Sequence, residues 1–78
     1  MEKDRYDIYV MEVDEEDHII PGTDKWQASF FDGGDARNYF LNMVDSVRNS
    51  KKEGIRTRVA MEYIGNYGVT DVDDEIIA

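Results

Sequence analysis

The sequence predicts an α+β fold, in which a small antiparallel sheet in the order β-β-α-β carries one helix packed on one face. Three segments have the alternation or the β-branched and aromatic content of strands, and one has the apolar stripe of an amphipathic helix. A chain of 78 residues has room for one small hydrophobic core. We therefore expect residues 1–78 to form a single small acidic domain.

Two strands are predicted in the first half of the chain. The first runs from Tyr6 to Val13 and is apolar on both of its faces. The second, Lys25 to Phe31, alternates between apolar and polar residues. An acidic stretch and a Pro-Gly pair between them indicate a long connection. The two strands are expected to pair as an antiparallel hairpin.

A helix is predicted from about Asp35 to about Lys52. Its apolar residues recur at the spacing of one buried helical stripe, namely Ala36, Tyr39, Phe40, Met43, Val44 and Val47. Asp32 or Asp35 is suited to cap the N-terminus, and Gly54 is placed for a left-handed C-cap. The helix and the strands together give a predicted core of Trp26, Phe30, Tyr39, Phe40 and Val44.

A third strand follows the helix, because the residues from Ile55 to Ile64 alternate with a period of two. Arg56 and Arg58 fall on its more polar face. A Gly-Asn-Tyr-Gly segment then interrupts the alternation, and residues 69–78 mix acidic with apolar side chains. This tail is compatible with a fourth strand, a partner-docking segment or a flexible acidic tail.

Charge is sorted into blocks along the chain. Residues 1–24 carry nine acids against two bases, residues 25–58 carry seven bases against four acids, and residues 59–78 carry five acids and no base. The net charge is -9. Such separation produces strong local potentials that select partners without dictating a fold.

Several classes of protein are disfavoured by composition. The chain has no cysteine, which excludes disulfides and thiolate metal sites and is compatible with a cytoplasmic protein. No apolar run approaches the roughly 18 residues of a membrane span, so no membrane association is expected. We also expect the chain to be unprocessed.

The sequence motifs predict no catalytic, cofactor-binding or metal site. The acids from Asp14 to Asp17 lack the spacing of a calcium-binding loop, since His18 and Ile19 occupy its fifth and sixth positions. The Asp-Gly-Gly-Asp segment at Asp32 matches neither phosphate-binding glycine pattern. His18 is the sole histidine, and an enzyme would require a pocket that brings it near two carboxylates. We therefore expect a protein that is not an enzyme.

Direct binding of nucleic acid is also not expected. The basic stretch from Arg48 to Arg58 resembles a phosphate-binding surface, and tyrosines are available for stacking. A chain with an isoelectric point near 4.3 nevertheless repels a polyanion at long range. These bases are expected to pair with acids of the same chain or of a second copy.

The acidity favours a binding protein whose partner is a basic protein surface. Carboxylates on a small sheet can imitate a nucleic-acid backbone and occupy the basic groove of a nucleic-acid-binding protein. The predicted contact residues are the acids near the two ends of the chain, expected to converge on one face: Asp14, Glu15, Glu16, Asp17, Asp71, Asp73, Asp74 and Glu75. In size, acidity and β-β-α-β outline the chain resembles small phage-encoded inhibitors of the anti-CRISPR type. That resemblance rests on no residue motif and implies no functional residue.

A self-associating accessory or structural module is the alternative. A single helix covers only one face of a sheet, so apolar residues on the other face need cover from the tail or from outside the molecule. A homodimer or a partner interface through this face would supply that cover.

Overall fold

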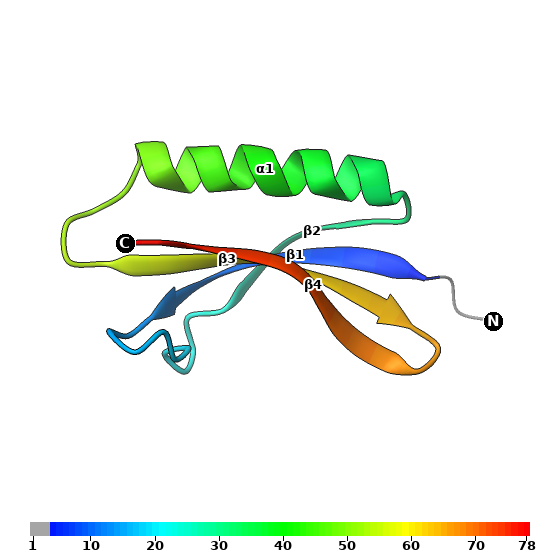
Figure 1. Ribbon diagram of the computed structural model, residues 1–78, viewed down its shortest axis with the longest axis horizontal. Coiled ribbons are helices and arrows are strands. Elements are labelled where there is room, and N and C mark those ends of the chain that lie inside the picture. The colour runs from blue at the N-terminus through cyan, green and yellow to red at the C-terminus, as the bar shows by residue number, and fades with distance from the viewer. Residues whose placement is uncertain (1–3) are drawn as a thin grey trace.

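The computed structural model describes residues 4–78, and it contains one helix packed on one face of a four-stranded antiparallel sheet (Figure 1). The elements in chain order are β1 (Arg5–Val13), β2 (Lys25–Phe30), α1 (Gly33–Asn49), β3 (Arg56–Gly65) and β4 (Gly68–Ile77). The spatial order of the strands is β2-β1-β3-β4. The predicted α+β class is confirmed, and most of the tail belongs to the fourth strand, Gly68–Ile77.

The two central strands, β1 and β3, carry apolar residues on both faces because the sheet is covered at least partly on both sides. On the helix side, Ile8 of β1 lies opposite Met61 of β3, and both are buried. On the other side, Tyr9 lies opposite Ala60. The period of two thus places consecutive residues of each strand in two separate apolar clusters.

The main core lies between α1 and the two central strands. Ala36, Phe40 and Val44 of the helix are buried against Ile8, Val59 and Met61 of the sheet and Ile77 of β4. Tyr39, Met43 and Val47 are partly buried at the margins of the same cluster, so the predicted stripe is confirmed. Phe30 also packs at this margin and contacts Tyr39 with ring centroids 5.3 Å apart.

The helix begins as the capping signals predict but ends earlier. Asp32 is the N-cap, and its side chain accepts a hydrogen bond of 2.9 Å from the backbone N–H of Asp35. The C-terminal cap is Ser50, whose backbone N–H donates to the Ser46 carbonyl. The predicted extension to Lys52 is therefore wrong. Gly54 does adopt a positive φ of 84°, but it does so in the connection to β3.

Trp26 is not part of the core, contrary to the prediction. The pairing of β1 with β2 is irregular between Ile8 and Tyr9, so that Ile8 lies opposite Ala28 while Tyr9 lies opposite Trp26. Gln27 has no opposing residue in this register. The bulge reverses the face of the residues before it, and the Trp26 side chain is 58% exposed on the side away from α1.

The strand β4 forms a sheet edge and a long hairpin with β3. The two strands are joined through Asn66 and Tyr67, and Gly68 has a φ of 119°, a conformation that favours glycine. The hairpin and the β1–β2 connection both bend away from α1, at opposite ends of the sheet (Figure 1). Carboxylates along β4 deter other strands from adding to this edge.

The residues described here include no helix long and apolar enough to cross a membrane.

Phe40→Ala is expected to destabilise the protein by about 3–5 kcal/mol, because it leaves a cavity in the main core of a small domain. Phe40 is 2% exposed. Urea denaturation followed by circular dichroism measures the change. Leu41→Ala, on the solvent side of the same helix, is the control and should change the free energy of unfolding by less than about 1 kcal/mol. Equal losses in the two variants would contradict the assignment of the core.

Candidate functional site

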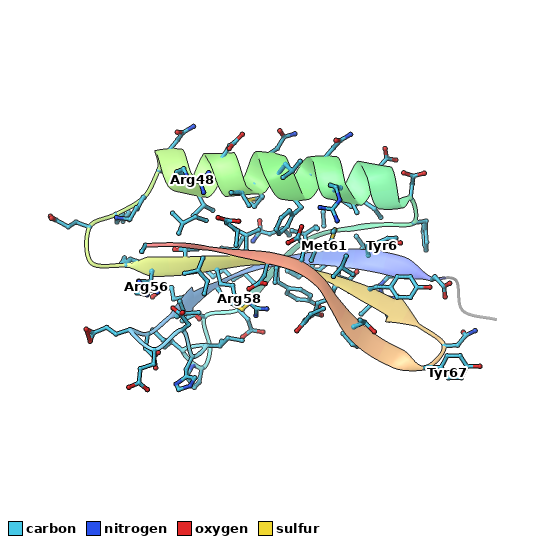
Figure 2. The ribbon with its side chains drawn as sticks, in the orientation of Figure 1. Tyr6, Arg48, Arg56, Arg58, Met61 and Tyr67 are labelled. Atoms are coloured by element: carbon cyan, nitrogen blue, oxygen red, sulfur yellow. The ribbon has the colours of Figure 1, made fainter. Side chains whose placement is uncertain are left out.

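The acidic connection between β1 and β2, residues 14–24, folds around its first carboxylate. Asp14 Oδ1 accepts hydrogen bonds of 2.9 Å from the backbone N–H groups of Glu16 and His18. The bond from the His18 backbone is the main cause of a lowered pKa at Asp14. Asp17 adopts a left-handed φ of 67°. Its carboxylate pairs with Arg56, which lies beside this connection in Figure 2.

His18 lies between two carboxylates of its own loop. Its Nδ1 atom is 3.7 Å from Asp14 Oδ2 and 3.7 Å from Glu16 Oε1. The imidazole side chain is 73% exposed, so these three groups lie in open solvent at the surface of the loop. The arrangement brings a histidine near two carboxylates without the pocket that acid-base catalysis needs to exclude water.

The carboxylates at the end of β4 form ion pairs with arginines of the same molecule. The pairs are Arg37 with Asp73 at 2.8 Å, Arg58 with Asp74 at 3.0 Å, and Arg48 with Glu75 at 3.5 Å. Asp73 and Glu75 lie on the helix side of the sheet, where they meet side chains of α1. Asp74 lies on the opposite side with Arg58, and Figure 2 shows Arg48 and Arg58 on these two sides of the sheet.

The prediction that the acids near the two ends of the chain converge on one face is therefore wrong. Strand alternation divides the β4 acids between two faces, and four of the eight predicted contact residues are paired with arginines. Glu15 and Glu16 lie exposed in the β1–β2 connection. Asp71 is on the side of the sheet away from α1, opposite Glu62 of β3.

The sheet face opposite α1, which we call the open face, carries a different group of acids: Asp7, Asp24, Glu62 and Asp71. Its apolar centre consists of Met11, Val13 and Ala60, all buried. The β1–β2 connection covers one end of this face, where Ile19 forms a β-bridge with Val13. Beyond that end, no helix or strand of the described chain covers the face (Figure 1).

A buried carboxylate anchors the open face between β1 and β2. Asp7 is 2% exposed, and its Oδ1 atom accepts hydrogen bonds from Ser29 Oγ at 2.6 Å and Arg5 Nε at 3.0 Å. Ser29 Oγ in turn accepts a hydrogen bond of 3.0 Å from Trp26 Nε1. The chain of bonds satisfies the buried charge and holds the exposed indole in a defined orientation.

Next to this network the open face contains a hollow of about 430 Å³. Its lining comes from both central strands and from the β1–β2 connection, and comprises Tyr9, Met11, Ile19, Asp24, Arg58 and Glu62. The floor is thus partly aromatic and apolar, while Asp24 and Glu62 supply carboxylates. Since Arg58 is paired with Asp74, its charge is already partly compensated.

Burial and neighbouring carboxylates disfavour the ionised forms of two groups in the lining. Burial raises the pKa of Glu62, and the nearby charges of Asp71 and Asp7 raise it further, against an opposing effect of Arg58. Burial likewise raises the pKa of Tyr9, with added repulsion from Asp7, Glu62 and Asp24. A cationic side chain placed here would relieve this repulsion, and its aliphatic stem would contact the apolar floor.

Of the acids on the open face, the sequence analysis predicted Asp71 as a contact residue and did not predict Glu62 or Asp24. The alternation of β3 does place Glu62 on the same face as Arg58. The missing information was strand register, since only the pairing of β3 with β1 and β4 brings Glu62 close to Asp7 and Asp71.

The part of the chain that the structure describes contains no group of three or more His, Asp or Glu side chains arranged to hold a metal ion. Comparison with known protein families, curated proteins and solved structures found no match. The function is therefore inferred from the chemistry of the surface itself.

Glu62→Gln is expected to raise the free energy of unfolding near neutral pH. The folded-state pKa of Glu62 lies above its ordinary value of 4.5, so ionisation is disfavoured in the folded protein. The associated stability is present below the unfolded-state pKa and is lost as pH rises through the folded-state pKa. The advantage of the glutamine variant should therefore disappear in acid, where Glu62 itself is protonated.

Thermal denaturation measured from acid to neutral pH tests this expectation. The matched control is Glu53→Gln, which removes the same charge from an exposed position between α1 and β3. The two variants should diverge near neutral pH and agree at acid pH. Identical pH profiles would contradict a raised pKa of Glu62 in the folded protein.

Proposed function

We propose that this protein is a non-catalytic binding protein that engages a basic protein surface through the open face of its sheet. The observation that carries the proposal is the hollow at Tyr9, where carboxylates surround an apolar floor. A lysine or arginine of a partner inserted there would contact Asp24 and Glu62 with its charged end. Its methylene groups would pack on Tyr9 and Met11.

Exposed aromatic residues lie around this face. Trp26 is on the open face and is oriented by its hydrogen bond to Ser29. Tyr67 is fully exposed at the tip of the β3–β4 hairpin, as Figure 2 shows. Tryptophan and tyrosine are enriched among residues that contribute most of the energy of protein interfaces. The open face thus combines aromatic contact area with negative charge.

Self-association through the same face is the second candidate, and it is favoured because no helix or strand of the described chain covers most of this face. Charge opposes it, because a two-fold interface would bring Glu62 and Asp71 of one copy toward the same residues of the other. Like charges brought together at an interface weaken binding, so a basic partner fits this face better than a second copy.

An inhibitor that mimics nucleic acid, of the anti-CRISPR type, is the narrower form of the proposal. It is supported by the net charge of -9 and by the exposed carboxylates of Glu15 and Glu16. The arginine pairs at Asp17, Asp73, Asp74 and Glu75 reduce this support, because they neutralise half of the acids proposed as contacts. The open face requires only a basic protein surface, whatever that surface normally binds.

Decalysine is a suitable probe of where a basic ligand binds. In a nuclear magnetic resonance titration at low salt, we expect the largest shifts at Tyr9, Asp24, Glu62 and Asp71, with a dissociation constant that rises steeply with salt. The double variant Glu62→Gln and Asp71→Asn should weaken binding more than the matched double variant Glu15→Gln and Glu16→Gln. Equal weakening by the two variants, or shifts confined to residues 14–18, would contradict the proposal.

Light scattering at low and high salt separates the second candidate from the first. A dimer formed through the open face should keep its mass when salt is raised, whereas the proposed protein should remain monomeric in both conditions.

For any nucleic-acid-binding partner that is found, competition by its nucleic acid tests mimicry directly. A partner that binds this protein and its nucleic acid simultaneously would rule mimicry out.

A further inference from the structure

A second surface, on the helix side of the molecule, has the opposite charge. A groove of about 700 Å³ lies where the C-terminal end of α1 meets the end of β1, the start of β2 and the connection to β3. The C-terminal end of α1 and its connection to β3, which contribute to the lining, are at the left in Figure 1. Three lysines contribute to its lining, Lys25, Lys51 and Lys52. We call this surface the lysine groove.

In the described chain, arginines and lysines differ in whether they form ion pairs. Each arginine within residues 4–78 takes part in an ion pair with a carboxylate of the same molecule. The three lysines in that range form no ion pair within 4.0 Å, and all three line the lysine groove. The uncompensated positive charge of an acidic protein is therefore collected at one place.

The partial negative charge at the C-terminus of α1 accounts for the position of only two of the three lysines. Lys51 and Lys52 follow the C-terminus of α1, whose partial negative charge attracts cations. Lys25 comes from β2, which is remote in sequence, and has no such relation to the helix. Glu12 is the single carboxylate of the lining, so the charged side chains of the groove sum to a positive value in a chain of net charge -9.

The remaining lining includes apolar side chains. Val10 of β1 and Val47 of α1 are half-buried, and Ile55 lies in the connection between α1 and β3. The volume of about 700 Å³ falls within the roughly 300–1,000 Å³ of small-molecule sites. A ligand that is complementary to both the lysines and the apolar side chains of the groove has an anionic group attached to an apolar chain.

The charge of the whole protein selects for a small ligand. A polyanion such as nucleic acid or an acidic protein segment is repelled by the net charge of -9 in proportion to its own charge. A small molecule with one or two negative charges experiences much less of this repulsion. The local attraction of three ammonium groups then decides its binding.

We propose that the lysine groove is a binding site for a small amphipathic organic anion, a carboxylate or phosphate ester on an apolar chain. The anionic group lies among Lys25, Lys51 and Lys52, and the apolar chain lies along Val10, Val47 and Ile55. This site is separate from the open face and does not depend on the function proposed for that face.

Titrations of the full chain with four probes, followed by amide chemical shifts, test the proposal. Octanoate and octyl phosphate should give saturable shifts centred on Val10, Val47 and Lys51 to Ile55, and their relative affinities distinguish the two headgroups. Octanol, which lacks the charge, and inorganic phosphate, which lacks the apolar chain, should each bind at least tenfold more weakly.

Lysine-to-glutamine variants supply the second measurement. Lys25→Gln and Lys51→Gln should each weaken octanoate binding about two- to fivefold, the range expected for a partly exposed charge pair. Arg37→Gln is the control, since it removes one positive charge at the opposite end of α1 and should leave the affinity unchanged. The amide spectrum of each variant reports whether the fold is intact.

Three results would overturn the proposal. One is the absence of saturable shifts with both octanoate and octyl phosphate, and another is equal binding of octanol or inorganic phosphate. The third is a loss of affinity in Arg37→Gln as large as that in the lysine variants, which would indicate attraction by net charge rather than by the groove.

Discussion

The packing of the apolar stripe of α1, centred on Phe40, against the two central strands is the interaction on which the rest of the structure depends. It fixes α1 across the two central strands and so decides which sheet face is covered. The same placement brings Arg37 and Arg48 of the helix within reach of β4, while the end of the helix forms one wall of the lysine groove. The two candidate surfaces are therefore consequences of one buried interface.

Arginine and lysine have different roles in this molecule. The planar groups of Arg37 and Arg58 make hydrogen-bonded pairs with acids on neighbouring elements, and the other arginines also form ion pairs. These ion pairs compensate much of the negative charge that the sequence concentrates in β4. The lysines lie at the ends of elements and remain free to contact solvent or a ligand. The strongly acidic chain thus presents a cationic groove as well as an anionic face.

The open face is a consequence of the small number of elements in this domain. One helix is enough to cover one side of a four-stranded sheet, and the β1–β2 connection covers only one end of the other side. The remaining area combines a buried polar network, exposed aromatic residues and a carboxylate, Glu62, whose pKa is raised by burial and further by neighbouring acids. Repulsion of this kind would be relieved by the basic partner proposed above.

The sequence by itself determined the helix, the first three strands and the class of fold, because the helical stripe around Phe40 and the alternation of β3 depend on local spacing alone. It left open whether Asp32 or Asp35 is the N-cap and whether the tail forms a strand, and the structure has Asp32 as the cap and the tail as β4. Only the tertiary structure decided which charges remain available. A one-residue bulge placed Trp26 on the open face, and strand register brought Glu62 beside Asp71 while setting Asp74 against Arg58. Pairing between distant segments is not encoded in local periodicity, so the surfaces available for binding emerge only when the sheet is assembled.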